Sequence, residues 1–288
     1  MSVFPSPLVR VEELARYAEV GGDEPFPGCL RVIDVRWQLG HPANHGAYKA
    51  GHIPGAVWAD LDHQLADPPS AAAGRHPLPS LERLNAAAAA WGIHSDTTVV
   101  ALDGAGNMAS ARLWWLLGDA GFTAVHLLDG GWPAWLEAGL PVETGETVPP
   151  PGQVRLGPAG QQASLGIDEA AAWPERGLLF DARGRERYLG LSEPVDRRPG
   201  HIPGAVSAPT GDNLTASGHF RPADEIRRRF TALGAGPETS LAAYCGSGVT
   251  ACHEVFALRL AGFDAALYPG SWSQWSAADR PAARGAAA

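Results

Sequence analysis

The chain has 288 residues, of which 45% are hydrophobic, and a formal net charge of −9 at pH 7. This length suits two domains of ordinary size, and the negative charge argues against a nucleic-acid surface. We expect no signal peptide and no membrane-spanning segment. The three cysteines, at positions 29, 245 and 252, indicate a reducing compartment, the cytoplasm, and no disulfide framework.

Strand and helix patterns alternate along the chain. In the first half the predicted helices cover 9–18, 81–90 and 108–120, with a short one ending at 138, and the predicted strands cover 30–35, 98–102 and 125–128. In the second half the predicted strands cover 178–180, 241–244 and 265–268, and the predicted helices cover 222–233 and 251–261. This alternation predicts an α/β fold with mainly parallel sheets flanked by helices.

The second half of the chain repeats the first. The heptad Gly-His-Ile-Pro-Gly-Ala-Val occurs at 51–57 and again, unchanged, at 200–206. Tryptophans that recur at matched places are expected to pack in the two cores. We predict two tandem domains, 1–143 and 161–288, joined by a proline-rich linker at 144–160.

A glycine-rich loop with a cysteine, Cys245-Gly246-Ser247-Gly248, stands between a predicted strand and a predicted helix. Backbone N–H groups at a helix N-terminus have no partner inside the helix and favour an anion, here the thiolate of Cys245. The glycines let several N–H groups point at one centre, and the hydroxyls of Ser247 and Thr250 can donate there too. A buried cysteine beside an ordinary turn is the simpler alternative, but the coincidence of strand, loop and helix disfavours it.

The residues after the cysteine separate this loop from that of the cysteine phosphatases. Those enzymes need an arginine six places after the nucleophile to grip phosphate, and that place is Ala251. The run from 245 to 253, Cys-Gly-Ser-Gly-Val-Thr-Ala-Cys-His, instead resembles the active-site loop of the rhodanese superfamily. It is most similar to mercaptopyruvate sulfurtransferases, because Gly246 and Ser247 stand where thiosulfate-preferring rhodaneses have basic residues.

The repeat indicates which domain is active. Asp103 takes the place of Cys245 when the two loops are aligned. A carboxylate cannot carry sulfane sulfur, so we expect a silent first domain and an active second domain. The silent copy can still form one wall of the site.

The resemblance implies a two-step sulfur transfer without a metal or an organic cofactor. Cys245 takes sulfur from 3-mercaptopyruvate or thiosulfate and becomes a persulfide, and cyanide, a small thiol or a thioredoxin-like protein then removes the sulfur. Two other functions stay open: a thiosulfate:cyanide sulfurtransferase proper, and a persulfide carrier with little turnover. Two complete domains need no partner subunit, so we expect a monomer.

The resemblance also implies roles for single residues. Arg187 is expected to bind the anionic group of the donor, with Arg183 a weaker candidate. Asp181 is expected to hold the active loop from behind, together with Arg183. Gly246, Gly248, Val249 and Thr250 are expected to surround the bound donor.

Two features depart from the mercaptopyruvate pattern. Val195 and Asp196 stand near the place of the family's second arginine, so Arg197 or Arg198 would have to replace it. The family's serine–histidine–aspartate relay would use Ser247 and His52, but no aspartate precedes His52 in 40–49. His52 has a structural alternative, since His201 repeats it. Cys252 is expected to be a small buried side chain, or else a redox partner of Cys245.

Overall fold

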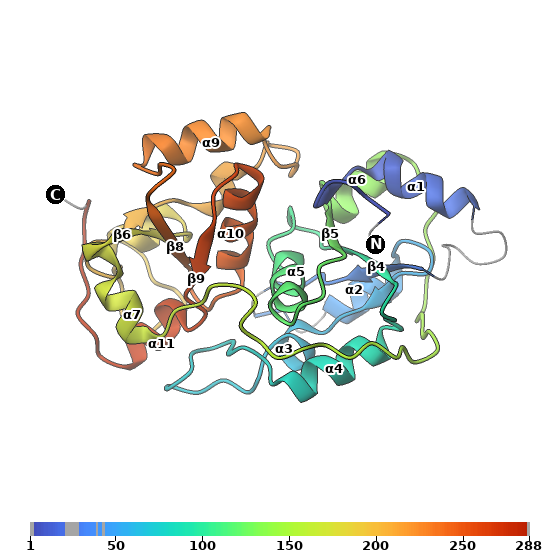
Figure 1. The fold of residues 1–288 in the computed structure, drawn as a ribbon, viewed down its shortest axis with the longest axis horizontal. Helices are drawn as coiled ribbons and strands as arrows, with labels where there is room; N and C mark the ends of the chain where they lie inside the picture. The colour runs from blue at the N-terminus through green and yellow to red at the C-terminus, as the bar shows by residue number, and fades with distance from the viewer. Residues whose placement is uncertain (1–2, 21–28, 39, 42–43, 287–288) are drawn as a thin grey trace. The chain divides into compact units, whose positions relative to one another are not determined.

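The computed structural model describes residues 3–20, 29–38, 40–41 and 44–286, and its contacts divide the chain into two compact units (Figure 1). Unit 1 comprises 1–65, 79–161 and 216–219, and unit 2 comprises 66–78, 162–215 and 220–288. The predicted boundaries differ from this division in two segments. Residues 66–78 come from the first half of the sequence but belong to unit 2, and residues 216–219 belong to unit 1.

Unit 1 contains a five-stranded parallel sheet in the order β1-β5-β4-β2-β3. Its strands are β1 (Leu8–Val9), β2 (Leu30–Asp34), β3 (Val57–Trp58), β4 (Thr98–Leu102) and β5 (Val125–Leu128). Its helices are α1 (Val11–Val20), α2 (Asn44–Ala50), α3 (Leu61–Gln64), α4 (Leu81–Ala90), α5 (Ser110–Asp119) and α6 (Gly131–Glu137).

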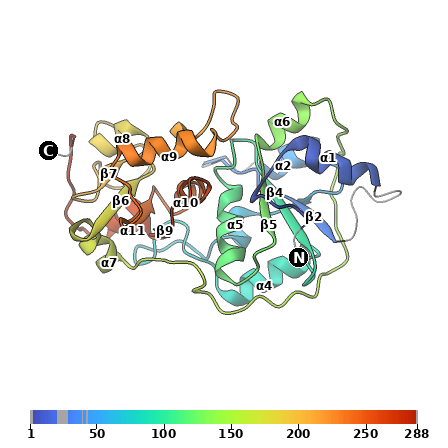
Figure 2. The same ribbon diagram turned by 45° about the horizontal axis from the view of Figure 1, so that its top comes forward.

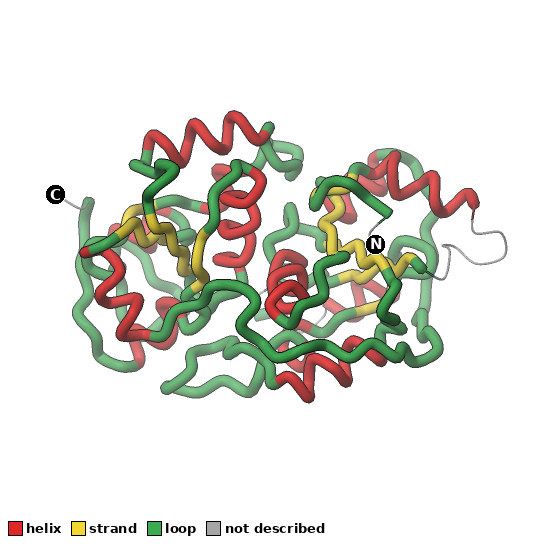
Figure 3. The backbone as a smooth tube through the Cα atoms, viewed as in Figure 1, coloured by secondary structure: helices red, strands yellow, loops and turns green. Residues whose placement is uncertain are grey.

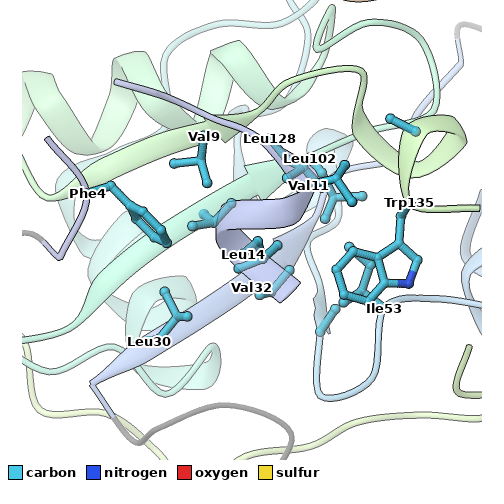
Figure 4. Packing of buried hydrophobic residues seen from close by; sticks show 13 residues of the cluster. Phe4, Val9, Val11, Leu14, Leu30, Val32, Ile53, Leu102, Leu128 and Trp135 are labelled. Carbon is cyan, nitrogen blue, oxygen red and sulfur yellow. The ribbon is translucent and has the colours of Figure 1, made fainter. Parts of the chain in front are cut away.

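Helices cover both faces of this sheet. On one face, side chains of α1 and α6 pack with alternate residues of the strands, among them Val32, Leu102 and Leu128, and Trp135 of α6 is in the same cluster (Figure 4). On the other face, α5 packs against β4 and β5. This is the layering expected when parallel strands are buried on both sides.

Unit 2 contains a four-stranded parallel sheet in the order β7-β6-β8-β9. Its strands are β6 (Gly177–Asp181), β7 (Val206–Ser207), β8 (Ser240–Tyr244) and β9 (Ala265–Leu267). Its helices are α7 (Ile167–Ala172), α8 (Arg185–Leu189), α9 (Ala223–Ala232), α10 (Thr250–Leu260) and α11 (Ser271–Ala277), with short 3-10 helices η1 (Trp173–Glu175) and η2 (Thr210–Asn213).

The second sheet is also enclosed by helices (Figure 3). Residues of α7 and α11 share a core cluster with β6, β8 and β9. Helix α10 packs on β8 and β9 and lies beside α9 (Figure 2). The prediction of two tandem α/β domains with parallel sheets is therefore confirmed.

The predicted linker is not a loose tether. Residues 144–160 are irregular chain that belongs to unit 1. Backbone N–H groups of Gly152, Val154 and Gly157 donate to carbonyl groups of Ala89, Ile93 and Ala120. These bonds hold the segment against unit 1. Within the described residues, no helix is long and apolar enough to cross a membrane.

Candidate active site

The site is built where two neighbouring strands of unit 2 end. In the register of β6 and β8, Asp181 pairs with Tyr244, and Cys245 follows directly. The carboxyl edge of a parallel sheet is where the loops of such folds gather reactive groups. The strand–loop–helix arrangement predicted around Cys245 is present, since α10 begins at Thr250.

The cysteine lies at the base of its loop. Its side chain is buried, and Gly248 N–H donates to Cys245 Sγ at 3.1 Å. Gly248 has φ +78°, and a Cβ atom there would lie 2.3 Å from the Pro269 carbonyl oxygen. Only glycine fits this position. The N-cap residue of α10, Val249, makes no side-chain capping hydrogen bond to the first amides of the helix.

The start of α11 holds the cysteine loop in place. Cys245 N–H donates to Ser271 Oγ at 3.1 Å, and the Cys245 carbonyl accepts from Trp272 N–H at 3.0 Å. Helix α11 also holds Gly246, because Ser273 N–H donates to the Gly246 carbonyl at 2.8 Å. The start of α11 therefore positions the cysteine loop mainly through backbone hydrogen bonds.

Behind the loop lies a buried network centred on Asp181. Tyr244 Oη donates to Asp181 Oδ2 at 2.6 Å, and Arg183 Nη2 donates to the same oxygen at 2.6 Å. Burial, and then the Asp181 carboxylate, raise the pKa of Tyr244, so the phenol stays a donor. Burial has the largest effect on the pKa of Arg183 and lowers it, but Asp181, together with Tyr244 and Glu193, raises this pKa overall. The Arg183 side chain is 1% exposed, so we assign it to loop support and not to donor contact.

Ser247 is bonded to a histidine that sequence reasoning missed. Its Oγ lies 2.7 Å from His76 Nδ1, and both residues are buried. His76 is on the segment 66–78, which belongs to unit 2. His76 is therefore a histidine partner of Ser247 within unit 2, while the expected pairing of Ser247 with His52 stays a prediction. The available signal was a long irregular stretch around 66–80, because long loops inside compact domains are often functional.

His52 lies in unit 1, in an environment that unit 2 repeats. Its Nδ1 is 3.0 Å from the Tyr48 carbonyl and its ring stacks on Tyr48 at 4.1 Å. The equivalent His201 Nδ1 is 2.7 Å from the Tyr188 carbonyl, with a ring separation of 3.8 Å. Both imidazoles are buried, and their matching contacts indicate a structural role in each unit. A direct part for His52 in the chemistry stays a prediction.

Matched substitutions of His52 and His201 separate a structural role of His52 from a catalytic one. We expect His52→Asn and His201→Asn each to lower the free energy of unfolding by about 1–3 kcal/mol, because each leaves a buried tyrosine carbonyl without its donor. Burial lowers the pKa of His201. The stability that neutral His201 contributes is thus present above about pH 6.5 and lost as the pH falls through its folded pKa. Urea unfolding at several pH values, with kcat measured in parallel, checks both. A loss of kcat confined to His52→Asn would restore its catalytic assignment.

Arg187 reaches the loop from α8. Its Nη2 donates to Glu193 Oε1 at 2.7 Å and to Asp196 Oδ2 at 2.9 Å, and its side chain is 23% exposed. The candidates for a second arginine lie elsewhere. Arg198 Nη2 donates to the Arg280 carbonyl at 2.8 Å, and Arg197 is exposed.

The remaining candidate residues include a second cysteine, Cys252, which forms no disulfide with Cys245. Cys252 is buried, and its Sγ donates to the Gly248 carbonyl at 3.2 Å. This bond supports the simpler of its two predicted roles. Val249 is buried and Thr250 is half-buried at the start of α10. In the described part of the chain, no group of three or more His, Cys, Asp or Glu side chains is arranged to hold a metal ion.

Comparison with known protein families identifies both halves of the chain. The rhodanese-like domain matches residues 18–138 and 167–278. The chain belongs to the rhodanese-like domain family.

Relatives of this rhodanese-like protein are named as sulfurtransferases. A putative thiosulfate sulfurtransferase of Mycobacterium tuberculosis is 42% identical, over 97% of this chain and 98% of its own. A probable 3-mercaptopyruvate sulfurtransferase of Pseudomonas aeruginosa is 46% identical, over 85% of this chain and 89% of its own. The solved structure of 3-mercaptopyruvate sulfurtransferase from Leishmania major superposes with a TM-score of 0.82 at 28% identity, covering 98% of this chain and 77% of that one. The chain is a sulfurtransferase.

The first rhodanese-like domain fills its own loop with a carboxylate. Asp103 is buried, and its Oδ1 accepts from the backbone N–H groups of Ala105 and Asn107 at 2.7 and 2.9 Å. Its Oδ2 accepts from those of Ala109 and Ser110 at 2.7 and 3.0 Å. The Asp103 carboxylate of the first domain thus takes the place among the loop N–H groups that Cys245 takes in the second domain.

Proposed function

We propose that the protein moves sulfur from 3-mercaptopyruvate through a persulfide on Cys245 to a thiol or cyanide acceptor. The observation that carries this proposal is the pairing of two reactive groups in one loop. Cys245 Sγ accepts from the loop amide of Gly248, and two residues along the chain Ser247 is bonded to His76. A nucleophile and a proton-transfer pair are what this donor requires.

In the first step the Cys245 thiolate attacks the sulfur of the donor. A sulfur–sulfur bond forms, the bond between that sulfur and C3 breaks, and its electron pair becomes the enolate of pyruvate. The enolate needs a proton at C3, which Ser247 supplies with His76 replenishing it. The outer sulfur keeps its hydrogen until the persulfide ionises, and the amides at the start of α10 then stabilise its charge.

In the second step the acceptor attacks the outer sulfur. The sulfur–sulfur bond breaks and its electron pair returns to Cys245 as a thiolate. Cyanide gives thiocyanate, and a thiol gives a new persulfide. The proposal also includes the acceptor, which is a small thiol or a thioredoxin-like protein when it is not cyanide. It further includes a monomeric protein in the cytoplasm that binds neither nucleic acid nor a membrane. The free thiols of the chain suit a reducing compartment.

Thiosulfate is the second candidate donor, because the relative that matches nearly the whole chain is named for it. Its leaving group is sulfite, which needs no proton to depart. The proton-transfer pair therefore has a use with mercaptopyruvate that it lacks with thiosulfate, which is our reason for preferring the first donor.

The test is kcat/KM for the two donors side by side, with cyanide as acceptor and the Cys245→Ser protein as blank. A clear preference for mercaptopyruvate is expected. A preference for thiosulfate would reassign the donor. Turnover of neither donor above the blank would leave the persulfide-carrier function.

Removing the proton-transfer pair should affect one donor only. We expect Ser247→Ala and His76→Gln each to lower kcat with mercaptopyruvate by about 10²–10⁴-fold, the usual range for general acid catalysis. Thiosulfate turnover by the same proteins is the internal control and should change little. Equal losses with both donors would mean that the pair shapes the loop and does not transfer a proton.

A further inference from the structure

The burial of Cys245 places different demands on small and large acceptors. Cys245 is only 2% exposed. Cyanide or a small thiol can diffuse to a buried sulfur, whereas a thiol on a protein brings a large body with it. A protein acceptor must therefore dock on the surface beside the cysteine loop before its thiol can reach the sulfur.

One surface loop of unit 2 lies directly beside the cysteine loop. We call residues 191–197 the rim loop. Arg187 connects the two loops: a Cβ atom placed on Gly246 would lie 3.4 Å from Arg187 Nη1. Arg187 Nη2 donates to Glu193 Oε1 at 2.7 Å and to Asp196 Oδ2 at 2.9 Å. The rim loop is thus the neighbour of the residue that follows Cys245.

A buried carboxylate holds the rim loop in shape. The Glu193 side chain is 2% exposed, and its Oε1 accepts from the backbone N–H groups of Val195 and Asp196 at 3.2 and 3.0 Å. At the start of the loop, Leu191 N–H donates to the Glu186 carbonyl at 3.0 Å. The loop is therefore ordered before a partner binds, which lowers the entropic cost of docking.

The rim loop presents hydrophobic side chains to the solvent. Leu191 is 76% exposed and Val195 is 40% exposed. Among the described residues of unit 2, these are the two large hydrophobic side chains that are exposed. Pro194, between them, is exposed as well. A single exposed leucine needs no explanation, but apolar side chains gathered on one ordered loop beside a reactive group indicate a surface that a partner covers.

The exposed charges around the rim loop are mostly basic. Arg185, Arg197 and Arg284 are exposed, and Arg284 Cγ would lie 3.0 Å from a Cβ atom placed on Gly190. As far as the structure describes the chain, none of these three arginines is in an ion pair. The exposed carboxylate beside them is Glu186. Since the whole chain has a net charge of −9, this surplus of arginine is local, and it favours an acidic partner.

We propose that the rim loop is the docking surface for a protein acceptor, an acidic thioredoxin-like protein that covers Leu191 and Val195. Its thiolate bonds to the outer sulfur on Cys245, the sulfur–sulfur bond breaks, and the electron pair stays on Cys245. This inference rests on the proposed function and names the surface that one of its acceptors uses. Cyanide and small thiols reach the sulfur without this surface.

The first experiment measures binding of reduced thioredoxin to the Cys245→Ser protein by calorimetry, so that no sulfur is transferred. Leu191→Ser and Val195→Ser should each raise the dissociation constant about 10-fold, as expected when an aliphatic side chain is no longer buried in an interface. Leu136→Ser is the matched control, because this leucine of unit 1 is also exposed, at 48%. Its dissociation constant should equal that of the parent.

Charge reversal tests the acidic character of the partner. A protein with both Arg185→Glu and Arg197→Glu should bind reduced thioredoxin about 10-fold more weakly at low salt. The difference from the parent should shrink towards 1 M salt, where exposed charges are screened over about 3 Å. Equal binding by parent and variant at low salt would remove the acidic partner from the inference.

A second measurement follows removal of the sulfur from preloaded Cys245. The rate constant with reduced thioredoxin should fall about 10-fold in Leu191→Ser and in Val195→Ser, whereas the rate constant with cyanide should not change. Leu191→Met keeps an apolar side chain and should retain the parent's rate with both acceptors. Equal losses with thioredoxin and cyanide would mean that the loop shapes the cysteine site and is no docking surface.

Other outcomes separate this inference from the proposed function. An unchanged dissociation constant in both serine variants would overturn the inference, and so would a parent that binds no thioredoxin. A change of oligomeric state in these variants, measured by sedimentation, would assign the surface to a second copy of this chain instead. A protein that binds thioredoxin through the rim loop but never loads sulfur on Cys245 would overturn the proposed function alone.

Discussion

Replacing Cys245 by serine is expected to abolish sulfur transfer from every donor. The hydroxyl of serine cannot form a persulfide, and loss of the nucleophile of a covalent mechanism costs at least about 10³-fold in kcat. The measurement is thiocyanate formation from mercaptopyruvate and from thiosulfate. Mass spectrometry of the parent protein after exposure to donor alone should show one added sulfur atom on the peptide with Cys245.

Cys252→Ser is the matched control. The same substitution is made seven residues further on, at another buried thiol, whose hydrogen bond to the Gly248 carbonyl a hydroxyl can replace. Most of the activity should therefore remain. Turnover that persists in Cys245→Ser, or that disappears equally in Cys252→Ser, would place the nucleophile elsewhere or make the loop geometry the cause.

Elements with strong local patterns were predicted residue by residue. Helix α4 and strands β4 and β5 have the predicted bounds, and α4 begins after Ser80, whose side chain accepts from Arg83 N–H. Such caps and apolar runs lie within a few residues of the element that they define, so a local reading of the sequence finds them. Helix α8 (Arg185–Leu189) was missed because five residues, three of them charged, give no periodic pattern.

The cysteine loop was predictable for the same reason, but its partners were not. Cys245, the glycines and the helix start are consecutive in sequence, and aligning the repeat exposed Asp103 as the inactive counterpart. The contact between His76 and Ser247 joins residues 171 positions apart. No local pattern marks which long loop of the first half belongs to the second unit. His76 was missed because it lies on that segment.

The contacts of Asp103 explain why the first domain keeps an ordered loop at the place of the cysteine loop. An empty nest of backbone N–H groups inside a protein is unstable without an anion or water to accept from it. In unit 2 the loop amide of Gly248 donates to Cys245 Sγ. In unit 1 Asp103 supplies the acceptors, so its carboxylate holds the loop as a structural element.

Replacing Asp103 by alanine should therefore destabilise the protein strongly without touching its chemistry. Four backbone N–H groups lose their acceptor at once. Breaking a buried charged network of this kind costs about 3–5 kcal/mol. Urea unfolding should show this loss in the transition of unit 1. Under the proposed function Cys245 carries the sulfur, so kcat/KM measured below the transition should stay near that of the parent.

Asp103→Asn is the graded control for this prediction. The amide keeps one oxygen, which can still accept from two of the four N–H groups, but its NH₂ group faces the other two donors. We expect a loss of stability that is clearly smaller than in Asp103→Ala, with the same unchanged kcat/KM. If both variants unfolded like the parent, the carboxylate would not be what holds this loop. If either lost activity while fully folded, the first domain would act on the donor or acceptor and would not be silent.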